Sequence, residues 1–92
     1  MSRFVLLYAP AEDVATKAQA HFPAHWQRCR EFHAAGTLLE VGIFADVQAH
    51  GAMGIFTSRE AAEEFVAGDA FVRNGVVSGW EIREWNEALQ VS

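Results

Sequence analysis

The chain has 92 residues, of which 51% are hydrophobic, and its 7 Lys and Arg are outnumbered by 12 Asp and Glu. The formal net charge of -5 argues against nucleic acids and anionic membrane surfaces as partners, because both are held mainly by clusters of Lys and Arg. No apolar run approaches the roughly 18 residues of a membrane span. The length predicts one domain, residues 1–92.

The single cysteine and the first residues bear on location. Cys29 cannot form an internal disulfide, and residues 1–4 lead straight into a strand-like run without the layout of a signal peptide. We therefore expect a soluble cytoplasmic protein. The apolar content exceeds what a small domain hides easily on its own, so we also expect a homodimer.

The first third of the chain predicts one strand and a helix in two parts. Residues 4–8 form a continuous apolar run closed by Pro10, which is typical of a strand buried on both faces. Residues 12–20 are predicted to be helical. Pro23 lacks an N–H and favours a first helical turn, so the main helix is predicted to begin there and to end at Gly36. Its buried stripe is expected to contain Trp26, Cys29, Phe32 and His33.

Two strands are predicted in the middle of the chain. Residues 37–44 and residues 52–57 have the apolar content and length of strands, and residues 46–51 are predicted to form the loop between them.

A helix and a last strand follow. Thr57 and Ser58 are candidate N-caps, and Glu60 stands at capping-box spacing from Thr57. Gly68 is predicted to end this second helix. A turn over residues 69–75 then leads to a strand at residues 76–85.

The order of these elements is strand, helix, strand, strand, helix, strand. It predicts an α+β, ferredoxin-like βαββαβ fold, with a four-stranded antiparallel sheet and two helices on one face. The second sheet face still carries apolar side chains. A second copy packed sheet to sheet is expected to cover it.

The same topology brings distant residues to one end of the domain. The first strand ends at Tyr8, the predicted main helix begins near His25, the second strand ends around Gly42, and the second helix ends at Asp69. All four positions fall at the same end of the sheet.

A histidine and an aspartate at one end of a domain have a chemical use. An imidazole with a pKa near 6.5 exchanges protons at pH 7, and a carboxylate that accepts its other N–H fixes the tautomer and raises its basicity. We expect Tyr8 to orient a substrate or donate a hydrogen bond, and Gly42 to let a ligand approach the backbone. The alternative is a purely structural hydrogen bond between His25 and Asp69, worth roughly 1 to 3 kcal/mol.

Several short motifs resemble the YCII-related (YciI-like) proteins over about residues 4–85. They are Pro23-Ala24-His25 before a helix, Leu38-Leu39 leading to Gly42, the helix containing Ala61 to Val66, and Asp69-Ala70-Phe71-Val72 followed by Gly75-Val76. The resemblance implies a dimeric α+β barrel of ferredoxin-like subunits, with His25 and Asp69 as an active-site pair in a cleft.

The resemblance also bears on the substrate. Phe22 stands where relatives often have a basic residue, and Ala70 stands where they usually have proline, which would hold the aspartate in a more rigid turn. Phe22 and Phe71 are assigned to substrate binding. One branch of the family is tied to dehydrochlorination of chlorinated hydroxyquinols.

The leading hypothesis is a small cofactor-independent enzyme that uses His25 and Asp69 for elimination or isomerisation on a small cyclic or aromatic metabolite. The alternatives are a non-catalytic dimer that binds a small molecule or a protein, and a relative of cofactor-free monooxygenases.

We expect neither a metal nor an organic cofactor. His21 and His25 have the spacing of a helical metal pair, but Pro23 lies between them and no third ligand is evident. The sequence contains no glycine-rich phosphate loop or nucleophile elbow.

Overall fold

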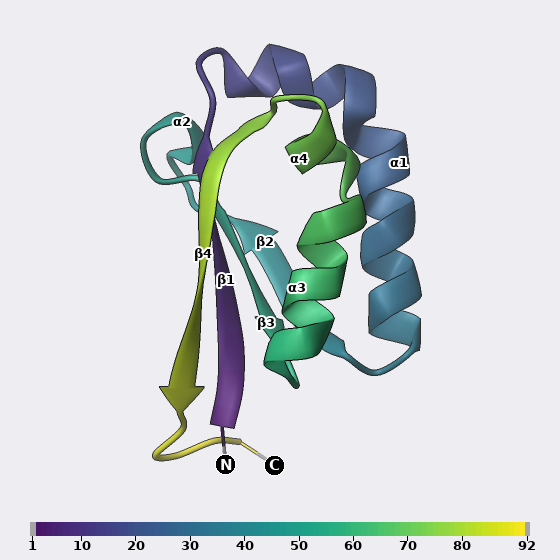
Figure 1. Cartoon of the computed structure of the whole chain (residues 1–92). Helices are drawn as coiled ribbons and strands as arrows, with labels where there is room; N and C mark the ends of the chain where they lie inside the picture. The colour runs from purple at the N-terminus through teal and green to yellow at the C-terminus, as the bar shows by residue number, and fades with distance from the viewer. Residues whose placement is uncertain (1, 92) are drawn as a thin grey trace.

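The computed structural model of the chain describes residues 2–91, which form one antiparallel sheet with helices on one side (Figure 1). The sheet order is β2-β3-β1-β4, which is the ferredoxin-like arrangement. The predicted α+β class and order of elements are therefore confirmed. The strands are β1 (Ser2–Pro10), β2 (Leu38–Ile43), β3 (Ala52–Phe56) and β4 (Val77–Asn86).

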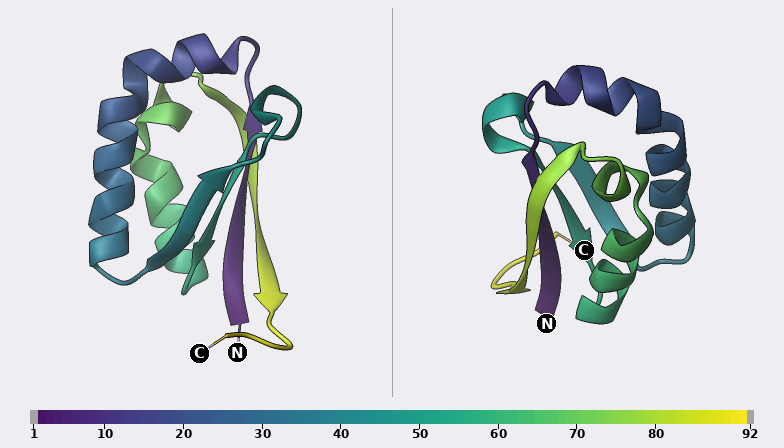
Figure 2. Two further views of the ribbon diagram at one scale, coloured as in Figure 1. Left: turned by 180° about the vertical axis from the view of Figure 1, so that it is seen from behind. Right: turned by 45° about the horizontal axis from the view of Figure 1, so that its top comes forward.

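The two long helices, α1 (Val14–Ala34) and α3 (Arg59–Gly68), lie on the same side of the sheet (Figure 2). Ser58 is the N-cap of α3, because its side chain accepts a hydrogen bond from the Ala61 N–H. Gly36, just after the C-terminal end of α1, has a φ of 83°. This conformation favours glycine and agrees with the predicted end of the helix there.

The predicted start of the main helix at Pro23 is wrong. Helix α1 is continuous from Val14 to Ala34, with Pro23 inside it. A proline inside a helix removes one backbone hydrogen bond and favours a bend. Figure 1 shows the first part of α1 crossing the end of the sheet and the second part descending beside it. His25 therefore lies in the middle of α1 and not in its first turn.

Two segments predicted as a loop and a turn contain short helices instead. These are α2 (Val47–His50) and α4 (Ala70–Arg73), each preceded by an aspartate. Asp46 accepts a hydrogen bond from the Ala49 N–H, and Asp69 accepts one from the Phe71 N–H. A single helical turn is too short to show a hydrophobic period, so the N-cap residue is its main signal in the sequence.

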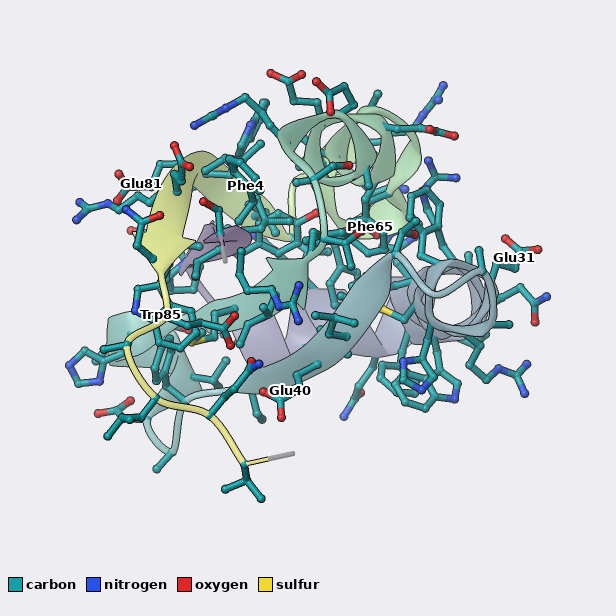
Figure 3. All side chains as sticks on the ribbon, turned by 90° about the horizontal axis from the view of Figure 1, so that it is seen from below. Phe4, Glu31, Glu40, Phe65, Glu81 and Trp85 are labelled. Carbon is teal, nitrogen blue, oxygen red and sulfur yellow. The ribbon has the colours of Figure 1, made fainter. Side chains whose placement is uncertain are left out.

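The core lies between the sheet and the helices. Leu6, Phe56 and Leu38 from the sheet are at most 3% exposed and pack with Cys29 of α1 and Phe65 of α3. Figure 3 shows Phe65 in this space between helices and strands.

The stripe predicted on α1 is only partly buried. Cys29 is buried and Phe32 packs against the core, but Trp26 is 45% exposed and His33 is also exposed. The Nδ1 atom of His33 lies 2.8 Å from the Leu38 carbonyl oxygen, so it ties the end of α1 to β2.

Strand β1 was predicted to be buried on both faces, and this is wrong for the subunit. Leu6 and Tyr8 are buried beneath the helices, whereas the alternating Val5 and Leu7 are partly exposed. None of the long helices in residues 2–91 covers the second face of the sheet, which we call the outer face (Figure 2). Figure 3 shows Glu81 directed away from the helices, on the side of this face.

Candidate active site

Asp69 is the centre of a buried polar cluster. Its residue exposure is 0%, and it is the buried charged residue of the core. Its Oδ1 lies 2.7 Å from Nδ1 of His25 and 3.2 Å from the Phe71 backbone nitrogen, and its Oδ2 accepts a hydrogen bond of 2.6 Å from the Tyr8 hydroxyl. These three donors offset the cost of removing the carboxylate from water.

Three segments far apart in the sequence position this cluster. Tyr8 is near the end of β1, His25 is in α1, and Asp69 lies between α3 and α4. Asp69 is held at the N-cap of α4 by its own hydrogen bond to the Phe71 N–H, so the turn stays ordered with Ala70 in place of proline. The structure thus brings together the histidine, the aspartate and the tyrosine that the topology placed at one end.

The contact with Asp69 determines the tautomer of His25. An ionised carboxylate only accepts hydrogen bonds, so Nδ1 of His25 carries a hydrogen and Nε2 of the neutral ring keeps a lone pair. The ring stacks on Phe71 with centroids 3.8 Å apart and planes 5° apart. Nε2 lies 3.5 Å from Sγ of Cys29. Nε2 is therefore the nitrogen available to exchange a proton.

Tyr8 and Cys29 stay protonated near neutral pH. Burial, with the hydrogen bond to Asp69 as the second cause, raises the pKa of Tyr8 well above its usual value. Burial, followed by the negative charge of Asp69, raises the pKa of Cys29 to about 12. The thiol is thus a weak donor and not a nucleophile, as expected for a buried small side chain. The Tyr8 hydroxyl donates its hydrogen to Asp69, so toward a ligand its oxygen can act only as an acceptor.

A cavity of about 140 Å³, the first cavity, lies between α1 and the sheet and is lined by His25 and Cys29. Its walls also include aromatic side chains, Phe22, Trp26 and Phe71 among them. Among residues 2–91, no Asp, Glu, Lys or Arg lines it. An apolar cavity of roughly 150 Å³ holds one benzene ring, so the first cavity fits a single uncharged ring.

The predicted site residues take different places around this cavity. Tyr8, Phe22, His25, Gly42 and Phe71 line it. Asp69 does not line the first cavity, but it contacts His25, which does. A Cβ added at Gly42 would meet no atom within 4 Å, so there is open space beside this residue, and the approach of a ligand to its backbone stays a prediction.

Trp26 and Cys29 are lining residues that the sequence reading did not assign to the site. Both follow Phe22 and His25 at helical spacing on α1, so extending that period would have found them. The rings of Phe22 and Trp26 stack with centroids 6.0 Å apart. Phe22 is 50% exposed and Trp26 is 45% exposed, which places the pair at the surface beside the cavity.

The described chain offers little to hold a metal ion. Residues 2–91 contain no group of three or more His, Cys, Asp or Glu side chains arranged to bind one. In the same range, no helix has the length and apolar character that crossing a bilayer requires.

Comparisons with known proteins agree with this fold. Residues 2–86 match the family described as the YCII-related domain. The structure is similar to 5-chloro-2-hydroxyhydroquinone dehydrochlorinase from Burkholderia phenoliruptrix AC1100 in complex with 2,5-dihydroxybenzoquinone, with a TM-score of 0.75 and 16% identity over 94% of this chain and 95% of that chain.

A second solved structure is more distant. It is described as a candidate antibiotic biosynthesis monooxygenase from Nitrosomonas europaea, with a TM-score of 0.54 and 11% identity over 97% of this chain and 100% of that chain. At these identities the likeness shows the fold alone. No curated protein matches the sequence significantly.

Proposed function

The chain belongs to the YCII-related family, and we propose that it is a small enzyme in which His25 moves a proton on a neutral cyclic or aromatic metabolite. The observation that carries this proposal is the 2.7 Å contact between Nδ1 of His25 and the fully buried Asp69, beside an apolar cavity. The histidine is thereby held in one tautomer at a place where a ring can bind.

The proposed reaction begins with proton abstraction. Nε2 of neutral His25 takes a proton from a hydroxyl or carbon of the substrate, and the ring becomes an imidazolium. The carboxylate of Asp69 stabilises this cation through Nδ1–H, and the attraction is strong because the surroundings exclude water. Asp69 thus offsets the positive charge that His25 gains in this step.

The electron pair that the substrate gains then decides the outcome. In an elimination it forms a double bond while a leaving group departs with its own bonding pair, as chloride would. In an isomerisation Nε2–H returns the proton to a different atom of the same substrate. The likeness in fold to a dehydrochlorinase supports elimination as the first reaction to test.

The lining of the cavity supports an uncharged substrate. No Lys or Arg among residues 2–91 lines the first cavity, so a carboxylate or phosphate would lose its hydration there without gaining a partner. Phe22, which stands where relatives often have a basic residue, lines the cavity with its apolar ring.

The test is a turnover screen of chlorinated and unchlorinated hydroquinones with wild type, His25→Ala and His21→Ala. His21 is also on α1 but does not line the first cavity, so it is a matched control. We expect His25→Ala to lose at least about a hundredfold in kcat/KM, because general acid and base catalysis contributes roughly 10²–10⁴. Circular dichroism checks that both variants fold.

The same screen separates the alternatives. Activity that survives in His25→Ala would contradict the proposed base. Ligand binding without any turnover would indicate a non-catalytic binding module. Oxygen consumption during turnover would place the protein with cofactor-free monooxygenases.

We also propose that two copies pair through their outer sheet faces. Val5 and Leu7 of β1 pair with Ile55 and Met53 of β3 and form a partly exposed apolar strip in the middle of this face. Covering such a strip is the usual reason for symmetric association. The cytoplasmic location stays a prediction.

A further inference from the structure

A second cavity of about 280 Å³ lies beside the first one, beneath the first part of α1. Residues that line it but not the first cavity include Val14, Ala15 and Ala18 of α1, and Val47, Val76 and Val77. No Asp, Glu, Lys or Arg of residues 2–91 lines it. It is twice as large as the first cavity, and none of the residues that line it alone is aromatic.

His25 lies where the two cavities meet. Phe22, His25 and Ile43 line both of them, as do Tyr8 and Phe71. Phe22 is 50% exposed and Ile43 is 72% exposed. Exposed side chains change rotamer on fast timescales, so a ligand can extend from one cavity into the other past these two side chains.

The walls of the two cavities differ in chemistry. Trp26, Phe56 and Phe65 line only the first cavity, together with Cys29 beside Nε2 of His25. The walls particular to the second cavity are Ala, Val, Pro and Gly. A flat ring is matched by the aromatic walls, and a flexible hydrocarbon is matched by the small aliphatic ones.

We propose that the ligand of this protein has two parts: an uncharged ring that binds beside His25 in the first cavity, and an aliphatic arm that occupies the second cavity. The placement of the reacting ring rests on the proposed function. The binding of the arm does not, because it requires only the shape and the apolar lining of the second cavity.

The probes are phenol and 4-alkylphenols with chains of one to six carbons, which are uncharged at pH 7. Their affinities are measured by titration calorimetry on the full chain. In the wild type we expect the affinity to rise by up to about fourfold for each methylene that enters the cavity. The gain should stop when the chain fills the second cavity.

Two alanine variants on the same helix provide the comparison. Ala18→Phe fills the second cavity, whereas Ala20→Phe adds the same ring at an exposed position that lines neither cavity. We expect Ala18→Phe to bind phenol like the wild type and to lose most of the gain from longer chains. Ala20→Phe should keep the whole gain.

Two results would overturn the proposal. One is an equal gain per methylene in all three proteins, and the other is failure of the wild type to bind any member of the series. Turnover does not enter this experiment. The two-part ligand therefore stands even if His25 proves non-catalytic. It fails, independently of the proposed function, if His25 is essential for turnover but the affinity does not rise with the length of the alkyl chain.

Discussion

The two faces of the sheet differ in what covers them. The long helices lie on one side of the sheet (Figure 2). On β1, Leu6 and Tyr8 are 3% and 8% exposed beneath these helices, whereas Val5 and Leu7 on the outer face remain partly exposed. The same strand is therefore core on one side and surface on the other. A single chain thus contains a complete core and the His25–Asp69 contact, and leaves an apolar strip exposed on the outer face.

The faces also differ in how far water reaches their charged contacts. His25 and Asp69 meet at 2.7 Å with side chains 12% and 0% exposed. Glu81 and Arg83 meet at 2.9 Å on the outer face, with side chains 53% and 68% exposed. Water screens the second pair, so similar distances have very different consequences for stability.

The largest effect is expected from Asp69→Ala. This change leaves the Tyr8 hydroxyl, the His25 N–H and a backbone N–H buried without their acceptor, and should lower the free energy of unfolding by about 3 to 5 kcal/mol. Urea denaturation measures it. Asp46→Ala is the control, because Asp46 caps α2 at an exposed position and should cost about 1 kcal/mol. Equal losses would show that the polar cluster is no more important than an ordinary cap.

The next effect tests the outer face. Ile55→Lys places a charge in the middle of the proposed interface and should weaken dimerisation at least about a hundredfold, because an unpaired buried charge costs several kcal/mol. Light scattering at micromolar concentration measures the mass. Ala67→Lys, at an exposed position on α3, should leave the dimer intact. A wild type with the 10.2 kDa mass of one chain would contradict the interface itself.

The third effect is a loss of stability at high pH, caused by Tyr8 on the helix-covered face of the sheet. Because the pKa of Tyr8 is raised in the folded protein, the folded state keeps a proton that the unfolded state releases above about pH 10. The stabilisation is therefore complete below pH 10 and falls as the pH rises, with a slope approaching about 1.4 kcal/mol per pH unit. Tyr8→Phe should remove this slope.

The chain is well suited to that measurement. Tyr8 is the single tyrosine, so tyrosinate absorbance reports it alone. Cys29, with its pKa raised from 9.0 to about 12, contributes a loss of the same sign that begins near pH 9, so the comparison is made in a Cys29→Ala background. Tyrosinate absorbance near pH 10 in the folded protein would contradict the buried hydrogen bond to Asp69.

The smallest effect concerns the turn that presents Asp69. Ala70 is the first residue of α4, and Asp69 before it has φ -74° and ψ 127°, which a following proline accepts. Ala70→Pro should raise the free energy of unfolding by about 0.5 to 1 kcal/mol by restricting the unfolded chain. Ala70→Gly should lower it by a similar amount. Thermal unfolding distinguishes the two, and a destabilising proline would show that the turn is strained.

Part of the site could be predicted from the sequence, because the topology determines at which end of the sheet each strand and helix ends. The ends of β1 and α3 had to meet at one end of the sheet, which brought Asp69 toward Tyr8 and His25. The start of α1 was misplaced, because Pro23 carries the same signal inside a bent helix as at a helix start. His25 nevertheless contacts Asp69 as expected, and the second part of α1 runs down beside the sheet (Figure 1).

The sequence by itself determined the order of strands and helices, the ferredoxin-like sheet and the residues at the end of the sheet near His25, because hydrophobic periods and turn residues act locally. Only the tertiary structure decided that Tyr8 donates to Asp69, that Asp69 lies behind His25 and not in the cavity, and that a second cavity adjoins the first. Burial, side-chain direction and cavity shape depend on contacts between segments distant in sequence, and no local pattern encodes them.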